Sequence, residues 1–221
     1  QGLGKPAASD GYFQAFTGDT FSPLFFFMVF LILTTLIVMA GVEKGIENVS
    51  KFLMPLLVLL TAGIAIYTLT LPGSMEGLKY YLVPDFGKFS FKTICAAMGQ
   101  MFYSMSLAMG IMITYGSYTK DEISLSKSVN QIEIFDTIIS LLAGLLIIPA
   151  VYIFSGEAGL KSSGAGLMFI TLPKVFDQIP KGELIGFLFF ALVLFAALTS
   201  SVSIMEAIVS AIMDKFRLSR N

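Results

Sequence analysis

The sequence contains no histidine, a single cysteine and few charged residues. Without histidine, the chain lacks Ser-His-Asp and Cys-His catalytic groups and histidine ligands for zinc. Cys95 has no partner for an intrachain disulfide, and its place at the head of an apolar run is typical of a buried, inert thiol. Charged residues make up 13% of the chain and the net charge is −1, so we expect no nucleic-acid partner.

Apolar residues dominate what is present. They form 56% of the chain and give a mean hydropathy of +0.83, too apolar for a soluble domain of this length. A helix that spans a bilayer needs about 20 mostly apolar residues. We therefore expect an all-α, polytopic membrane helix bundle. Its predicted spans are about 22–41, 53–72, 93–115, 137–155 and 184–213.

The ends and loops indicate how the bundle is organised. The odd number of spans and a loop-like start, QGLGKPAASDG, suggest one segment of a longer protein. Loops are alternately short and long, and Lys and Arg are denser per residue on the short-loop side, which favours a cytoplasmic position for that side. The long loops at 1–21 and 156–183 are then extracellular. The second contains an apolar patch, GLMFITLPKVF, that predicts a short helix covering one face.

Three adjacent hydroxyls, Thr199, Ser200 and Ser201, lie within the last predicted span, in FFALVLFAALTSSVSIME. Polar groups in a bilayer must bond to the backbone, to another helix or to a ligand. Thr199, Ser203 and Glu206 share roughly one helical face, which suggests the wall of a polar site. The alternative is that each hydroxyl bonds to the carbonyl one turn earlier. Glu206 has no partner visible in the sequence and is interpreted as structural.

The predicted span 93–115 also contains polar and small residues. Gln100 and Ser104 lie four apart on one face, and Ser106 and Gly110 follow. Such residues indicate either close helix packing or a helix that unwinds and leaves carbonyls free for a cation or an ammonium group. No proline occurs there, so the sequence leaves both interpretations open.

Two further features are unusual for membrane spans. Asp136, one turn before Ser140, places a carboxylate at the start of an apolar run, at a cost of a few kcal/mol unless it reaches the interface. Gly45 and Pro55 enclose nine residues near the start of another span. Glycine and proline both weaken a helix, so this part is expected to unwind easily, although a helix with a tolerated proline is the simpler interpretation.

Four motifs together resemble the bacterial branch of the neurotransmitter:sodium symporter family, in that family's order and spacing. They are GVEKGIENVSKFLMP, GQMFYSMSLAMGIMITYGSY, GLMFITLPKVF and FAALTSSVSIME. The resemblance implies a leucine-transporter-type fold with inverted repeats, of which this chain is similar to transmembrane helices four to eight. It implies a multi-pass protein of the inner membrane that carries an amino acid with two sodium ions by alternating access, without covalent chemistry. The remaining helices of the same transporter and the lipid bilayer would be its partners.

The resemblance assigns ligands to both sodium ions. Thr199, Ser200 and the carbonyl of Ala196 would ligate the second sodium, and Ser104 and Asp136 would face the first. The residues that match a chloride site in animal relatives are Gln100, Ser104 and Ser140. Asp136 falls where those relatives carry a neutral Asn, so its carboxylate would supply the negative charge and chloride is expected not to be required.

The resemblance also assigns the substrate site. The carbonyl of Tyr103 and the hydroxyl of Ser106 would take the ammonium group of an amino acid. The side-chain pocket would be lined by Tyr103, Met109, Ser200, Ser203 and Ile204. Tyr103 and Met109 replace aromatic residues of many relatives, so the pocket shape is not carried over. A flexible methionine and the absence of matching charges favour a neutral, bulky apolar amino acid.

Ser117 and Tyr118 match the family's cytoplasmic gate. Unwinding of the Gly45–Pro55 segment would open a water path for release of the second sodium. A rival interpretation is a non-transporting membrane bundle, such as a receptor or scaffold subunit, that uses these polar residues only for packing. An intramembrane hydrolase built around Ser200 is disfavoured, because no histidine is present and no lysine accompanies it inside a span.

Overall fold

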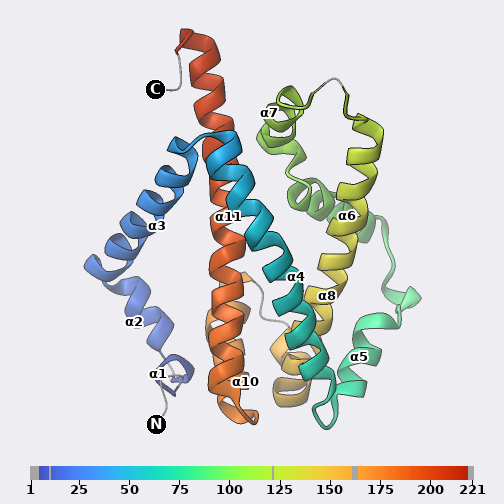
Figure 1. Ribbon diagram of the computed structural model, residues 1–221. Coiled ribbons are helices and arrows are strands. Elements are labelled where there is room, and N and C mark those ends of the chain that lie inside the picture. Colours follow the sequence, from blue (N-terminus) through green and yellow to red (C-terminus); the bar gives the residue numbers. More distant parts are fainter. Residues whose placement is uncertain (1–4, 10, 121, 161–163, 219–221) are drawn as a thin grey trace. The chain divides into compact units, whose positions relative to one another are not determined.

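The computed structural model describes residues 5–9, 11–120, 122–160 and 164–218. Every regular element in these ranges is a helix, which confirms the predicted all-α fold. Parts of the predicted loops 1–21 and 156–183 lie outside the described residues. The elements, labelled in Figure 1, are α1 (Lys5–Ala8), α2 (Tyr12–Gly18), α3 (Phe21–Met39), η1 (Val42–Glu47), α4 (Asn48–Leu69), α5 (Ser74–Leu82), η2 (Phe86–Lys88), α6 (Phe91–Ser104), η3 (Leu107–Met109), α7 (Ile111–Ser117), α8 (Leu125–Leu160), α9 (Gly164–Gly166), η4 (Leu167–Thr171), α10 (Leu172–Gln178) and α11 (Gly182–Phe216).

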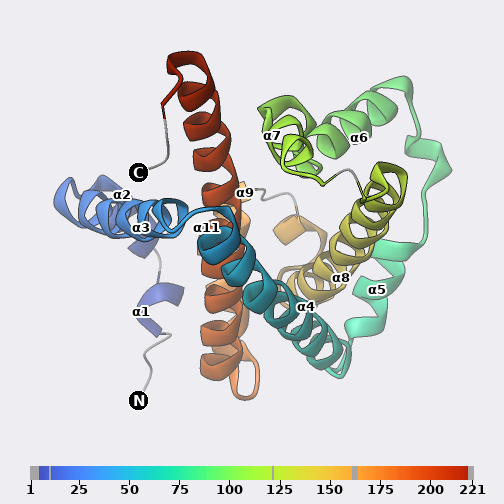
Figure 2. The ribbon, with the colours of Figure 1, turned by 45° about the horizontal axis from the view of Figure 1, so that its top comes forward.

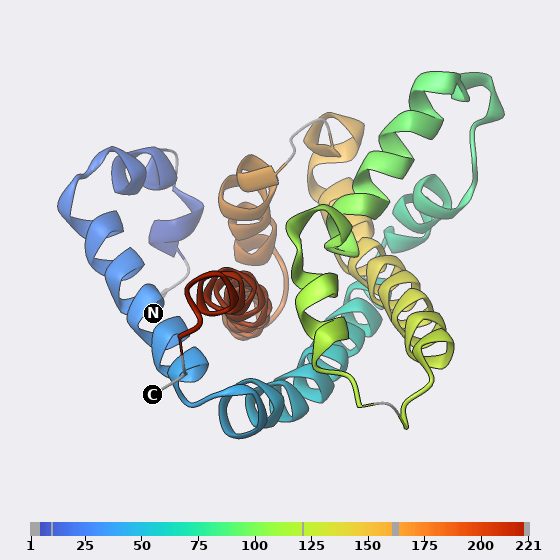
Figure 3. The ribbon, with the colours of Figure 1, turned by 90° about the horizontal axis from the view of Figure 1, so that it is seen from above.

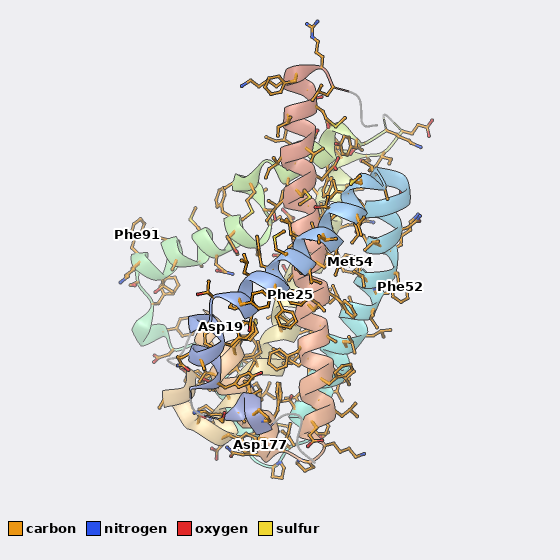
Figure 4. The ribbon with its side chains drawn as sticks, turned by 90° about the vertical axis from the view of Figure 1, so that its left-hand side faces the viewer. Asp19, Phe25, Phe52, Met54, Phe91 and Asp177 are labelled. Atoms are coloured by element: carbon orange, nitrogen blue, oxygen red, sulfur yellow. The ribbon has the colours of Figure 1, made fainter. Side chains whose placement is uncertain are left out.

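Four helical stretches of the described chain are long and apolar enough to cross a membrane: Phe21–Met39, Gly45–Leu69, Leu125–Gly156 and Gly182–Phe216. They cover four of the five predicted spans. Many of their side chains are exposed and apolar, such as Phe25 of α3 and Phe52 and Met54 of α4 (Figure 4). Exposed apolar side chains on helices of this length are suited to contact with lipid.

The helix that contains Asp136 is longer than the apolar run predicted. It begins at Leu125, because the polar segment LSKSVNQIE contains no helix-breaking residue, and Asp136 therefore lies well inside α8. Its regular geometry is interrupted at Gly156, with φ 55° and ψ −158°, where the predicted loop begins. Only a residue without a Cβ adopts this conformation easily.

The chain divides into two compact units, and each is described by itself. Unit 1 comprises residues 1–31, 54–84 and 141–196; unit 2 comprises residues 32–53, 85–140 and 197–221. In unit 1, the apolar patch of the predicted loop forms η4 and α10, and α10 packs beside the first half of α11 (Figure 3). Leu172 is fully buried, and the rings of Phe176 and Phe189 lie 5.3 Å apart between centroids.

The hydrophobic core of unit 2 is smaller. Its buried members are Val38, Ile46 and Val202, against which Tyr115 packs. Hydroxyl groups add contacts between α3 and α11: Thr34 Oγ1 lies 2.9 Å from Ser201 Oγ, and Thr34 is only 1% exposed. Helices in unit 2 thus meet through both apolar and polar side chains.

Candidate functional site

The predicted span 93–115 is broken in the structure. α6 ends at Ser104, Ser106 and Gly110 both have positive φ angles of 55° and 74°, and α7 begins at Ile111. Figure 2 shows the chain turning between α6 and α7. A left-handed conformation costs a serine energy that a glycine avoids, and such strain gathers at functional sites. Unwound backbone inside a membrane leaves carbonyl oxygens for a ligand or an ion.

At the end of α6, Ser104 contacts the unusual carboxylate. Its hydroxyl donates a hydrogen bond to Asp136 Oδ2 of α8 at 3.1 Å. Asp136 is half-buried, and Ser140 lies one turn further along α8, while Gln100 lies one turn earlier along α6. The structure thus brings together Ser104 and Asp136, the two residues predicted to face the first sodium.

The residues predicted for the second sodium lie on α11. Ala196, Thr199 and Ser200 fall within little more than one turn, and Ala196 and Thr199 are half-buried. Ser203 donates to the carbonyl of Thr199 at 3.1 Å, and Ser201 donates to the carbonyl of Leu198 at 2.9 Å. These backward bonds are the alternative that the sequence left open for the hydroxyls, and they apply to Ser201 and Ser203.

Two tyrosines of the α7 segment contact α11. Tyr115 donates to Ser203 Oγ at 2.9 Å, and Tyr118 donates to Glu206 Oε1 at 2.6 Å. Glu206 is fully buried, and Tyr118 provides the partner that the sequence did not reveal. Sequence reasoning missed Tyr115. The available signal was a matched spacing: Tyr115 of α7 and Tyr118, directly after α7, lie three residues apart, as do Ser203 and Glu206 on α11.

The predicted substrate residues are not enclosed. Tyr103 and Met109 are 68% and 38% exposed, and Ser200 and Ile204 are exposed as well. A cavity of about 480 Å³ lies elsewhere, in unit 1, lined mainly by Phe176, Phe187 and Phe190 with neighbouring residues of α10 and α11. The chain therefore leaves the predicted substrate side chains open.

The predicted hinge has a structural feature of its own. Gly45 lies in η1, a π-helical turn, and is buried so closely that a Cβ would collide with the carbonyl oxygen of Ile37. Such turns inside helices are frequent at functional sites. Pro55 is exposed inside α4, which continues through it to Leu69. In this structure the Gly45–Pro55 segment is wound.

The family model described as "Sodium:neurotransmitter symporter family" matches residues 18–221. The "Uncharacterized sodium-dependent transporter YhdH" of Bacillus subtilis is 43% identical over 185 residues, which cover 84% of this chain and 40% of that protein. An "Uncharacterized sodium-dependent transporter" of Haemophilus influenzae is 36% identical over 216 residues, which cover 98% and 47%.

A solved structure is similar over nearly the whole chain. The crystal structure of MhsT in complex with L-phenylalanine matches with a TM-score of 0.84 and 39% identity, covering 98% of this chain and 50% of that one. The chain thus spans about half the length of MhsT, as it spans less than half of the two relatives above.

Proposed function

The chain belongs to the sodium:neurotransmitter symporter family, and from this premise we propose that it forms part of a transporter that carries a neutral, bulky apolar amino acid together with sodium by alternating access. Family membership and four membrane-length helices make it part of a multi-pass membrane protein. Its relatives are named as transporters rather than enzymes, and the proposed cycle has no covalent step. We place it in the inner membrane of a bacterium.

The break between α6 and α7, with Ser104 bonded to Asp136 at its edge, is the observation that carries the proposal. The hydroxyl of Ser104 and the carboxylate of Asp136 offer oxygen ligands to the first sodium. The negative charge of the Asp136 carboxylate would offset the positive charge that sodium brings into a low-dielectric site. In this proposal Gln100, Ser104 and Ser140 need hold no chloride.

The second sodium would bind at the α11 turn that contains Thr199 and Ser200, with the carbonyl of Ala196. Neutral oxygens suit this ion, because they replace its water without adding charge that would trap it. Two sodium ions would then accompany each substrate in the complete transporter.

The substrate ammonium group would bind where the backbone is unwound, at the carbonyl of Tyr103 and the hydroxyl of Ser106. Tyr103, Met109, Ser200, Ser203 and Ile204 would line the side-chain pocket. Because Ser203 donates its only proton to Thr199, it can accept but not donate a hydrogen bond there. The bound L-phenylalanine of MhsT supports an apolar, bulky cargo.

Alternating access would use the α7 segment and the Gly45–Pro55 segment. Tyr118 bonded to Glu206, together with Ser117, would close the cytoplasmic side, and separation of α7 from α11 would open it. Unwinding of the Gly45–Pro55 segment would admit water to the second sodium.

Binding by the purified complete transporter tests the proposal. We expect radiolabelled phenylalanine to bind only when sodium is present, and leucine, methionine and tryptophan to compete. Lysine, arginine, aspartate and glutamate should not compete, because no matching charge is among the pocket residues that this chain contributes to the proposed site. Well-folded protein that binds no amino acid in the presence of sodium would favour a non-transporting bundle instead.

A further inference from the structure

Two chains of hydroxyl groups converge on the α11 turn that carries Thr199 and Ser200. Both chains begin on another element of unit 2. The first runs from Thr34 of α3 through Ser201 to the carbonyl of Leu198, over 2.9 Å and 2.9 Å. The second runs from Tyr115 of α7 through Ser203 to the carbonyl of Thr199, over 2.9 Å and 3.1 Å. Neither Thr34 nor Tyr115 belongs to the proposed ion or substrate ligands.

Each chain restrains one serine of α11. Ser201 and Ser203 each donate to a carbonyl of α11. Tyr115 donates to Ser203, whereas in the pair of Thr34 and Ser201 either hydroxyl can be the donor. A hydroxyl that accepts a bond becomes a stronger donor, so Tyr115 strengthens the bond that Ser203 makes to the α11 backbone, and the bond to Thr34 holds the Ser201 hydroxyl in place.

The outer residues are held firmly enough to aim their hydroxyls. Thr34 is 1% exposed, and the ring of Tyr115 packs against the core of Val38, Ile46 and Val202. Burial makes the loss of a hydrogen bond at either position costly.

The two carbonyls that accept these serine bonds belong to consecutive residues, Leu198 and Thr199. Each carbonyl thus accepts a side-chain bond in addition to its place in the backbone bonding of the helix. A serine that bonds to the carbonyl one turn earlier competes with the backbone N–H and bends the helix locally. The position of the Thr199 and Ser200 hydroxyls depends on this local backbone geometry. Contacts from α3 and α7 therefore reach the proposed second sodium site through the backbone, without either residue touching the ion.

We propose that Thr34 and Tyr115 are positioning residues for the second sodium: each holds the α11 turn, through Ser201 or Ser203, in the geometry that the ion requires. This inference rests on the proposed function. Since coupling between two equilibria is reciprocal, sodium at this turn in turn stabilises the contact of α7 with α11.

The test compares isosteric variants of the complete transporter, purified in detergent. Tyr115→Phe and Thr34→Val each remove one hydroxyl and retain the packing. The matched control is Thr68→Val, which removes a buried hydroxyl that bonds to the carbonyl of Ile64 within α4 of unit 1 at 2.9 Å. Two quantities are measured: the sodium concentration that half-saturates the thermal stabilisation of the protein without amino acid, and phenylalanine affinity at saturating sodium.

We expect Tyr115→Phe and Thr34→Val to raise the half-saturating sodium concentration by about twofold to tenfold, the range that one neutral hydrogen bond is worth. Phenylalanine affinity at saturating sodium should be unchanged in both, and Thr68→Val should leave the sodium dependence as in the wild type. If both variants lose thermal stability but keep the wild-type sodium dependence, the two hydroxyls contribute only to stability and the inference is overturned. It is also overturned if Thr68→Val raises the half-saturating sodium concentration by the same factor as the two variants.

The outcome also separates this inference from the proposed function. A wild-type protein that responds to sodium while both variants respond identically refutes only the positioning role. A wild-type protein without any sodium response refutes the proposed function, and the positioning role with it.

Discussion

In unit 1, α10 buries Leu172, Val175 and Phe176 in a core shared with α11, whereas in unit 2 the buried apolar residues are few and specific polar pairs join the helices. Ser104 with Asp136, and Tyr118 with Glu206, are two of those pairs. Apolar burial has no preferred direction, while a hydrogen bond has one partner and is either made or broken.

Most of the predicted ion, substrate and gate residues belong to unit 2; Ala196 and Pro55 belong to unit 1. Elements that move during function are drawn from the parts of a protein with low local stability. The comparison therefore suggests that unit 1 provides packing and unit 2 provides contacts that open and close. Substitutions that separate stability from function test this division.

Asp136→Asn should have the largest effect, on function. It removes the negative charge beside the first sodium, so we expect transport to be lost or to become dependent on chloride, with little change in thermal stability. Uptake is measured with gluconate replacing chloride, in the wild type and the variant. A large loss of wild-type activity in gluconate would contradict the role given to Asp136.

Phe176→Ala should lower stability and leave sodium-dependent binding intact, the reverse of Asp136→Asn. Removing a buried ring that packs on Phe189 and Phe190 leaves a cavity and costs about 3–5 kcal/mol of stability. The midpoint of thermal unfolding should fall, while the sodium dependence of phenylalanine binding by the remaining folded protein is retained. A specific loss of sodium dependence at unchanged stability would show that unit 1 does more than provide packing.

Tyr118→Phe should weaken the gate. The hydrogen bond that Glu206 accepts from the Tyr118 hydroxyl stabilises the contact of α7 with α11 by about 1–3 kcal/mol. Without it, α7 should separate from α11 more often. The readout is the labelling rate of a cysteine placed at Thr119, in a Cys95→Ser background. Tyr80→Phe, in a tilted ring pair with Tyr152 in unit 1, is the matched control. Equal labelling in Tyr118→Phe and the wild type would argue against a gate here.

Pro55→Ala should have a smaller effect. Restoring a backbone hydrogen bond stiffens the start of α4, so we expect slower sodium release and lower turnover with substrate affinity nearly unchanged. Turnover and affinity are measured in the same preparation. If the well-folded variant has an unchanged transport turnover, the Gly45–Pro55 segment does not act as a hinge for sodium release.

Asp19→Asn should have the smallest effect, on stability alone. The Ser22 hydroxyl and the backbone N–H groups of Ser22 and Phe21 donate to Asp19 and hold the pKa of its carboxyl below its ordinary value. Its contribution is present above the unfolded pKa and is lost as the pH falls through the folded pKa. The wild type and the variant should therefore differ slightly in thermal midpoint at neutral pH and converge in acid.

The fold was predictable from the sequence because membrane spans depend on composition over long windows. The all-helical fold and the family are both confirmed. The break after Ser104 was one of two open interpretations, since Ser106 takes its left-handed conformation without a proline or a glycine at that position. Backbone strain of this kind depends on surrounding structure that periodicity does not encode.

The site was only partly predictable for a similar reason. Asp136 was noticeable by its charge, but its bond to Ser104 joins residues 32 positions apart. In the sequence, Tyr115 resembles an ordinary apolar residue of a membrane helix. Only the structure shows that its hydroxyl donates to Ser203, 88 positions away. Local patterns identify which side chains are unusual, whereas tertiary packing decides which of them meet. The roles of these residues in ion and substrate binding remain predictions.

Uptake by the complete transporter in sealed lipid vesicles tests the central claim most directly. Radiolabelled phenylalanine is added outside the vesicles, in a buffer whose cation is either sodium or choline. The vesicle interior contains neither of these two cations, so the sodium buffer creates an inward sodium gradient. We predict that phenylalanine accumulates above its external concentration only with the inward sodium gradient, and that the accumulated label leaves when a sodium ionophore dissipates the gradient. Equal uptake with choline, or no uptake by well-folded protein with sodium, would contradict sodium-coupled transport.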